Sequence, residues 1–451
     1  MKKMTKFAAL LMALVLAMGS MTACGGNDGS GSATTAPQAT AAGGEEGGEN
    51  QSTGEATPVT LKVWTPQEEQ KQKGGFGDYG DNLLNYMVEE FNKSQSNWVL
   101  TIDAAVCSEA DLNSEMSKDA EAGADVFMLP GDQALGLQES GVLYPLSGDG
   151  AEVVKANNPE AAIEAITFTD KDLGQDFIYG VPFTSNQWFI YYDKSLFTED
   201  DVKSLDTMMA KDLGDGVYNF SMPMTDSFYT GSFFFAAGCE LFTNGDNSVC
   251  TFNDASGLEA ANYMIDMVSN KKFINEDGKG SARTKFKEGK LGAWCGGSWS
   301  AEDVKKELGD NYAAAALPTI KLGDKEVNLQ AFADYKYIGV NSHSEQKEAA
   351  QAFAEFLGGE AMQKVRFEAR GVIPTWSSLA SDEAVQSDPV AVAIDNQKDH
   401  LAPRAKTKQM NNYWNPVKAF GQGVYNKEIT KDNAQAKLDE MVNNILAEIT
   451  E

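Results

Sequence analysis

The chain has 451 residues, and its 66 acidic side chains outnumber its 37 basic ones to give a formal net charge of −29. A surface this acidic argues against binding to nucleic acid and against docking on anionic lipid through the protein surface. Because the chain has only two histidines, His343 and His400, it has almost no material for a His-based zinc site or a catalytic triad with a histidine base.

The N-terminus has the order of a secretory signal. Three lysines precede an apolar stretch, residues 7–18, that is too short to span a bilayer. We therefore predict a signal peptide over residues 1–23. The stretch Met21-Thr22-Ala23-Cys24 resembles a bacterial lipobox, which implies a diacylglycerol on Cys24 and attachment to the membrane through this lipid alone. An ordinary signal peptide that contains a cysteine is the alternative.

The next segment, residues 24–58, is rich in small and polar residues and shows no apolar periodicity. Such a composition cannot bury enough apolar surface to offset the entropy of ordering, so a flexible tether is predicted. The roughly 390 residues that follow are too many for one ordinary core and suggest two lobes. No later stretch reaches about 18 consecutive apolar residues, so we expect no transmembrane helix.

Strands and helices alternate through the rest of the chain. The apolar patterns predict a strand over 59–64, a helix over 82–92, a strand over 99–105, a helix through Leu112 and Met116, and a buried strand over 124–130. This β-α-β-α-β order is typical of a doubly wound α/β lobe. A second set follows, with strands over 188–192, 219–222 and 292–294, a helix over 257–269, and a C-terminal helix whose core stripe is Leu438, Met441, Val442, Ile445 and Ile449.

Two short motifs could indicate an enzyme, and neither has the right context. Residues 75–80 match G-x-G-x-x-G, but they lie in a loop some distance after the strand, so we expect no dinucleotide there. Residues 296–300 fall one glycine short of a G-x-S-x-G elbow, and no histidine is at hand to activate Ser298. We therefore expect no catalytic residues, no cofactor and no metal.

Cys239 and Cys250 flank a short stretch with an Asn-Gly turn signal at 244–245. Two interpretations stay open for this pair: a hairpin disulfide, or two buried free thiols. We expect Cys107 and Cys295 to be unpaired.

Several segments, taken in order, resemble one family. They are Ala124-Asp125-Val126-Phe127 with the Ser140-Gly141-Val142-Leu143 passage, Tyr179-Gly180-Val181-Pro182 with Trp188 to Lys194, Phe286 to Trp299, Ala313 to Pro318, and the helical stretch Ala349 to Leu357. Together they cover nearly all of the folded part. On these residues the chain is similar to the maltose/maltodextrin-binding proteins of ABC importers.

The resemblance implies a fold and a role. The fold would be α/β with two lobes, about 59–184 plus 335–374 and about 187–332 plus 376–451, that close like a hinge over a ligand. The role would be that of a lipid-anchored, extracellular solute-binding protein that captures a malto-oligosaccharide or similar sugar and passes it to an ABC transporter permease. We expect a monomer that is not an enzyme.

A sugar site needs aromatic plates for the apolar face of the pyranose ring and polar groups for its hydroxyl rim. Trp64, Asp132 and Gln133 follow the ends of predicted strands, where α/β sheets bind ligands. Trp64 could equally be core, and Asp132 could cap a helix. Asn186 and Trp188 are either cleft contacts or plain strand residues. Glu68 and Glu69 are weaker candidates in a polar loop.

The resemblance adds further site residues. It matches Asp132 to the family's sugar-bonding acid and places Gln133 where the best-known members have an arginine. It aligns Phe228 and Tyr229 with a stacking aromatic, and Trp299 and Trp414 with two stacking tryptophans; Tyr413 lies beside Trp414, and Lys418 stands where the family has a cation. We expect the two indoles to face each other across the gap between the lobes.

Two observations support Trp299 and Trp414 from the residues alone. Gly296 and Gly297 are poor strand formers, which suggests that they hold the backbone open before Trp299. Asparagines surround Trp414, unlike a core face. Phe228 taken alone is more typical of a core residue.

Two other classes of function stay open. One is a binding protein for another solute, such as a polyamine or a peptide; the scarcity of histidine argues against a transition metal. The other is a lipid-anchored glycoside hydrolase that uses two carboxylates, although the strand–helix order does not suggest an eight-unit barrel.

Overall fold

The computed structural model describes residues 56–72, 74–109, 111–276 and 281–449. They fall within one unit, Glu55–Glu451. The predicted signal peptide, Cys24 and almost all of the predicted tether lie outside the described residues. Among the helices that are described, none is both long enough and apolar enough to cross a bilayer.

The first sheet belongs to the lobe predicted from the β-α-β-α-β order. β1 runs parallel to β2 and β3, as strands joined by crossover helices must, whereas β14 is antiparallel to β3 and β6. β1 starts earlier than predicted because Thr57 already pairs with Trp98. The strand order is β2-β1-β3-β14-β6, with bounds β1 Thr57–Thr65, β2 Trp98–Val106, β3 Val126–Pro130, β6 Val181–Ser185 and β14 Tyr335–Val340.

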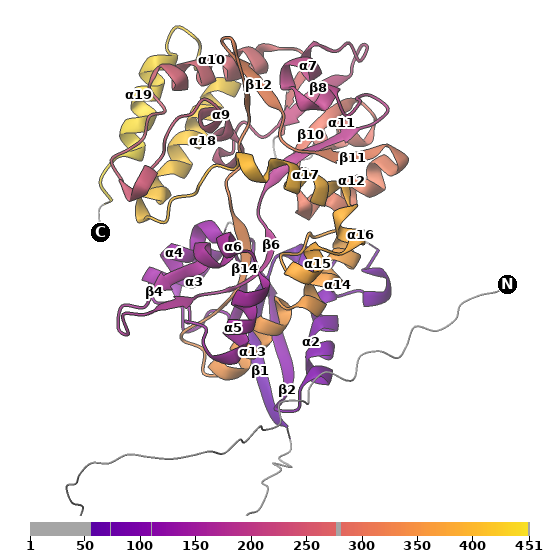
Figure 1. Ribbon diagram of the computed structural model, residues 1–451, viewed down its shortest axis with the longest axis vertical. Coiled ribbons are helices and arrows are strands. Elements are labelled where there is room, and N and C mark those ends of the chain that lie inside the picture. Colours follow the sequence, from indigo (N-terminus) through magenta and orange to yellow (C-terminus); the bar gives the residue numbers. More distant parts are fainter. Residues whose placement is uncertain (1–55, 73, 110, 277–280, 450–451) are drawn as a thin grey trace, which may run out of the picture. The chain divides into compact units, whose positions relative to one another are not determined.

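Helices pack against this first sheet and complete its core (Figure 1). α2 is typical: the side chain of Asn82 accepts a hydrogen bond from the Asn85 N–H at 3.0 Å, and the apolar side chains that follow at helical spacing are buried. The helices of this lobe are α1 Gln67–Gln70, α2 Leu83–Ser94, α3 Leu112–Lys118, α4 Gly131–Glu139, α5 Gly148–Asn157, α6 Glu160–Ile166, α13 Lys347–Leu357 and α14 Glu360–Arg370; β4 Thr167–Thr169 and β5 Asp176–Ile178 form a small separate sheet.

The second sheet has the order β11-β7-β10-β8-β9 and supports the second core. All six residues of β7 are buried, because β10 and β11 pair with it on either side and helices cover the sheet. Its strands are β7 Trp188–Asp193, β8 Tyr218–Met222, β9 Phe273–Asn275, β10 Leu291–Gly297 and β11 Tyr312–Ala315, and β12 Thr319–Leu322 pairs with β13 Lys325–Asn328.

The remaining helices follow the second sheet in sequence or pack on it. They are α7 Leu205–Ala210, α8 Ser227–Thr230, α9 Ser232–Ala236, α10 Ala255–Ser269, α11 Ser281–Lys287, α12 Ala301–Leu308, α15 Ser377–Ala380, α16 Glu383–Gln386, α17 Pro389–Gln397, α18 Asn411–Tyr425 and α19 Ala434–Ile445. The C-terminal helix is shorter than the predicted stripe. Ile449 lies beyond its end and is 41% exposed, so it is not a core residue.

The chain passes between the two sheets at segments that lie side by side. β6 of the first sheet leads within two residues into β7 of the second, and the residues before β14 make the return (Figure 1). The backbone N–H of Asn186 donates to the carbonyl oxygen of Asp334 at 2.8 Å, which joins these two crossings. At the third crossing, Thr184 Oγ1 donates to the carbonyl oxygen of Ile373 at 2.7 Å.

The predicted disulfide is absent, since Cys239 and Cys250 are both free thiols. The two residues do flank a hairpin-like turn, but its register pairs Leu241, not Cys239, with Cys250. The cysteines are therefore offset along the turn instead of lying opposite each other, where a disulfide fits best. The alternative interpretation of two buried thiols is confirmed.

Candidate functional site

The crossing segments present two different sides. Since side chains alternate along an extended chain, Ser185 and Gln187 point to one side while Thr184 and Asn186 point to the other. Ala333 and Tyr335 share the side of Ser185. The polar side carries Asn186, Asp334 and Lys336.

Trp299 is the residue on which this polar side converges. It lies in the short helix η4 (Ser298–Ser300), directly after β10, and it is half-buried against the second core. The ammonium group of Lys336, from β14 of the first sheet, lies 5.0 Å from the centroid of the Trp299 ring. Both carboxylate oxygens of Glu109 accept hydrogen bonds from the same ammonium group, at 2.7 and 2.8 Å. A carboxylate, a cation and an indole thus join the two lobes.

Contrary to what the sequence suggested, the two glycines before Trp299 do not hold the backbone open. Gly296 and Gly297 are regular members of β10 and pair with β7. A Cβ on Gly297 would lie 2.1 Å from a ring atom of Trp299, and a Cβ on Gly296 would lie 2.4 Å from a ring atom of Trp294. Glycine is therefore needed at both positions to make room for an indole, and the idea of a backbone held open is wrong.

The other predicted aromatic residues divide into rim and core. Phe228 and Trp414 are half-buried at the rim of the second core. Trp188 is 0% exposed and pairs with Gly297 of β10, which favours the interpretation of a plain strand residue. Tyr413 is also 0% exposed and donates its hydroxyl hydrogen to the Ser227 carbonyl oxygen at 2.8 Å, so its surroundings are those of a core residue.

The arrangement of the two tryptophans also differs from the expectation. Trp299 and Trp414 both pack on the second core, so they do not face each other across the gap between the lobes. What lies over Trp299 from the first lobe is Lys336. Tyr229 is buried too, with its ring centroid 4.9 Å from that of Trp188, and it belongs to the core more than to the rim.

Asp132 lies in the first turn of α4 and is part of an acidic cluster. The helix N-cap is Pro130, so the interpretation of Asp132 as the cap is wrong. Asp334 accepts a hydrogen bond from Asn186 Nδ2 at 2.8 Å, and its other carboxylate oxygen lies 3.0 Å from Arg404 Nη2. Burial and the nearby Asp334 carboxylate raise the pKa of Asp132 to about 7, although Arg404 opposes the shift.

Three further predicted residues have simpler surroundings. Both ends of the Gln133 amide are occupied: its Nε2 donates to the Glu109 carbonyl oxygen, and its Oε1 accepts from the backbone N–H of Asn113 at 3.1 Å. Gln133 therefore supports the loop that carries Glu109. Trp64 is half-buried against the first core, and Lys418 is exposed on α18.

Sequence reasoning missed Glu109, Lys336, Asp334 and Arg404, all near the predicted residues. Glu109 and Lys336 are 227 residues apart, so no local pattern links them. Glu69, which was named as a weak candidate, is instead buried and ion-paired with Arg366 and Arg370 of α14. Glu69 therefore links α1 to α14 within the first lobe.

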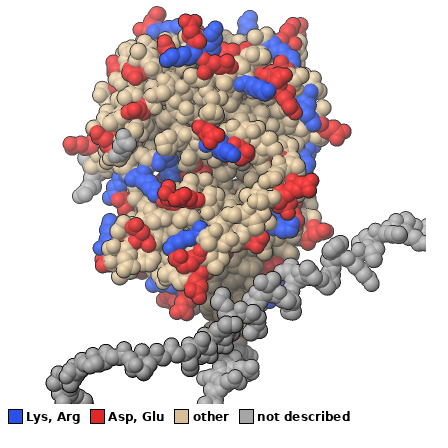
Figure 2. All heavy atoms as spheres, viewed as in Figure 1, with Lys and Arg blue, Asp and Glu red and all other residues tan. Residues whose placement is uncertain are grey.

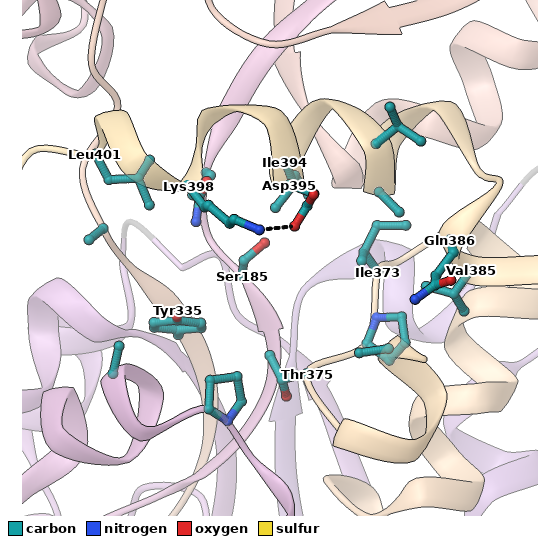
Figure 3. Close-up of a pocket in the computed structure, with 18 of the residues that line it drawn as sticks. Ser185, Tyr335, Ile373, Thr375, Val385, Gln386, Ile394, Asp395, Lys398 and Leu401 are labelled. Atoms are coloured by element: carbon teal, nitrogen blue, oxygen red, sulfur yellow. Dashed lines mark hydrogen bonds and ion pairs between the residues drawn. The ribbon is translucent and has the colours of Figure 1, made fainter. Parts of the chain in front are cut away.

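The opposite side of the crossing segments borders a cavity of about 810 Å³ (Figure 3). Its walls are mainly apolar and come from all three crossings and from α15 to α17. Ser185 and Tyr335 face it from the crossings, and an ion pair between Lys398 and Asp395, 2.9 Å apart, lies at its edge (Figure 3). None of the predicted site residues lines this cavity.

The charges suit a neutral ligand on the polar side. Near Trp299, Glu109 is neutralised by Lys336, and Glu69 by two arginines. On the face of the molecule in Figure 2, acidic and basic side chains are interspersed and form no basic field of the kind that nucleic acid requires. In the described ranges, no group of three or more His, Cys, Asp or Glu side chains is placed to hold a metal ion.

Comparison with known proteins identifies the family of this chain. A sequence profile described as bacterial extracellular solute-binding protein matches residues 86–393. A galactooligosaccharide-binding protein of Bacillus subtilis is 26% identical over 81% of this chain and 84% of its own length, and a maltooligosaccharide ABC transporter solute-binding lipoprotein of Streptococcus pneumoniae is 26% identical over 67% and 72%.

A solved structure described as being with acarbose is similar to most of this chain. It has 35% sequence identity and a TM-score of 0.78, and the match covers 86% of this chain and 98% of that one. The prediction of a two-lobe α/β fold is therefore confirmed.

Proposed function

Because the chain belongs to the family of bacterial extracellular solute-binding proteins, we propose that it captures an oligosaccharide on the polar side of its crossing segments. The proposed ligand is a malto-oligosaccharide or a galacto-oligosaccharide, the ligands named for its two relatives, and the recipient is the permease of an ABC transporter. The observation that carries the proposal is the half-buried indole of Trp299, set among carboxylates and cations of the first lobe.

The chemistry of the site supports a saccharide. An indole offers a flat apolar surface to the C–H face of a pyranose, while Asp132 and Glu109 offer acceptors to its hydroxyls. Phe228 and Trp414 supply further aromatic surface on the second lobe. Ligand held by both lobes would shift the equilibrium of lobe arrangements toward the closed one.

Thermal unfolding in the presence of candidate ligands tests the proposal. A ligand at about 100 times its Kd stabilises a protein by roughly 2.7 kcal/mol, which raises the Tm by several degrees. We expect maltotriose or a galacto-oligosaccharide to raise the Tm and spermidine to leave it unchanged. A rise with spermidine alone would refute the choice of ligand class.

We further propose that the protein binds its sugar without cleaving it. After prolonged incubation with malto-oligosaccharides, chromatography should recover the sugars at their original length. Shortened products that also form with a catalytically inert control preparation would be contamination, whereas products that only this protein forms would identify a hydrolase.

The lipid anchor on Cys24 is part of the same proposal. In cells fed labelled palmitate, the full chain should take up label and sediment with membranes. A Cys24→Ser variant should lose both properties, because no other attachment to the membrane is proposed.

A further inference from the structure

A basic segment of the chain, residues 403–410, runs between the lobes; we call it the basic strap. The chain as a whole has 66 acidic and 37 basic residues, yet no acidic residue occurs between Asp399 and Glu428. Within the strap, three cations stand at alternate positions: Arg404, Lys406 and Lys408. Such a run in an acidic chain points to a structural or binding use for the positive charge.

Both ends of the strap are fixed. Just before it, the backbone N–H of Ala402 donates to the Ala331 carbonyl oxygen at 2.8 Å, and the N–H of Ala333 donates to the Ala402 carbonyl oxygen at 2.9 Å. At its other end, the short helix η7 (Lys408–Met410) leads directly into α18, and Met410 is buried in the second core. The strap therefore determines where α18 begins, and α18 carries Trp414.

Two lysines of the strap contact helices and a strand of the first lobe. Lys406 Nζ donates to the carbonyl oxygen of Glu164 in the last turn of α6, and it lies 5.8 Å from the ring centroid of Phe168 in β4. Lys408 Nζ lies 3.3 Å from the Glu139 carboxylate in α4. Figure 1 shows α4, α6 and β4 together in one half and α18 in the other.

The physical setting favours these contacts. A cation at the C-terminal end of a helix is favoured by the partial negative charge there, and Lys406 shares the carbonyl oxygen of Glu164 in α6 with the backbone N–H of Thr167. Partial burial lowers the pKa of Lys406, although the neighbouring Glu164 opposes the shift. The same strap residues line a small cavity with Asp132 of α4 and Asn411 of α18.

We propose that Lys406 and Lys408 are positioning residues that hold the start of α18, and with it Trp414, against the first lobe beside Asp132. The inference rests on the proposed sugar-binding function. Since the contacts bridge two lobes, they form only while the lobes are close together. They therefore favour the arrangement in which both lobes can touch one ligand, and they raise the affinity without touching the ligand themselves.

Calorimetric titration with maltotriose tests this role in a Lys406→Gln/Lys408→Gln variant. Exposed or half-exposed ion contacts are worth little individually, so we expect the Kd to rise roughly 3- to 10-fold, with an unchanged Tm. The Lys406→Arg/Lys408→Arg variant should restore the affinity, because it keeps the charges. The wild-type affinity should fall as salt is added, and that of the Gln variant should change less.

A matched control separates the strap from a general effect of charge. Lys431 forms an ion pair with Asp266 at 2.7 Å within the second lobe, and its side chain is 52% exposed against 59% for Lys408. Lys431→Gln should leave the Kd unchanged. An equal loss of affinity in Lys431→Gln, or no loss in the double Gln variant, would overturn the proposal.

Small-angle X-ray scattering without sugar keeps this inference distinguishable from the proposed function. The double Gln variant should have a larger radius of gyration than the wild type and Lys431→Gln, because fewer contacts hold the lobes together. A further outcome is that the wild type binds no saccharide while the double Gln variant still has the larger radius of gyration. In that case the proposed ligand would be wrong, and the role of the strap in holding the lobes together would be supported. Identical radii would refute the strap whatever the ligand.

Discussion

Replacing Gly297 by alanine should damage sugar binding while leaving the fold largely intact. The new Cβ would lie 2.1, 2.2 and 2.6 Å from three ring atoms of Trp299, far inside van der Waals contact. The backbone itself tolerates alanine, because Gly297 is extended with φ −126° and ψ −175°. The indole must therefore move, and Trp299 is only half-buried, so its ring is not held on all sides.

The size of the effect follows from the stacking that is lost. A well-placed aromatic contact is worth about 0.5–1.5 kcal/mol beyond its buried area, so we expect the Kd of Gly297→Ala to rise roughly tenfold. Trp299→Ala should lose at least as much. Calorimetric titration measures the Kd, and urea denaturation of the same samples measures the free energy of unfolding.

Gly296→Ala is the matched control, since its Cβ would lie 2.4 Å from a ring atom of Trp294 in the same strand. Trp294 is buried, and its Nε1 donates to the Glu276 carboxylate at 3.1 Å, so this indole cannot move aside freely. Overpacking of this kind costs about 1–3 kcal/mol of stability. Gly296→Ala should therefore lower the free energy of unfolding with little change in the Kd. Gly297→Ala should raise the Kd with little change in the free energy of unfolding. A folded Gly297→Ala with wild-type affinity would refute the reasoning.

Three other predictions follow from buried ionisable groups. The raised pKa of Asp132, about 7, means that its contribution to the free energy of unfolding is largest below about pH 4 and is lost as the pH rises through 7. Asp132→Asn should flatten this dependence in urea denaturation at pH 5 and pH 8; an unchanged slope would contradict the assignment. Glu69→Gln should lower the free energy of unfolding by about 3–5 kcal/mol, since it leaves Arg366 buried without its carboxylate, and a loss near zero would show that water reaches the pair. Burial raises the pKa of Cys239 to about 12 and that of Cys250 to about 11, so neither thiol should react with a thiol reagent at pH 8 until the protein unfolds. Mass spectrometry of labelled peptides would detect early reaction.

The elements of the first lobe could be predicted from the sequence because their patterns are local. The apolar stripe of α2 and the buried run that became β3 each identify one element without reference to the rest of the chain. The family resemblance then suggested where the chain crosses between the lobes. The resemblance itself is confirmed by the family match and the solved structure similar to this chain.

The site was harder to predict because its members depend on tertiary packing. β7 is buried along its whole length, so no alternation in its sequence distinguishes a cleft residue from a core residue, and both interpretations of Trp188 stayed open. The contact between Lys336 and Glu109 joins distant parts of the chain. Arg404, in contrast, has a local signal, because it stands in a stretch without acidic residues between Asp399 and Glu428.

The cavity behind the crossing segments is partly open to solvent, so water can enter it. Its 810 Å³ are bordered by residues of both lobes, so a rotation of one lobe against the other changes the space between these walls. Compression favours whichever arrangement occupies less total volume. Scattering measurements under pressure would therefore change the arrangement of the lobes without any ligand or mutation. The change in the radius of gyration with pressure would measure how easily one lobe rotates against the other.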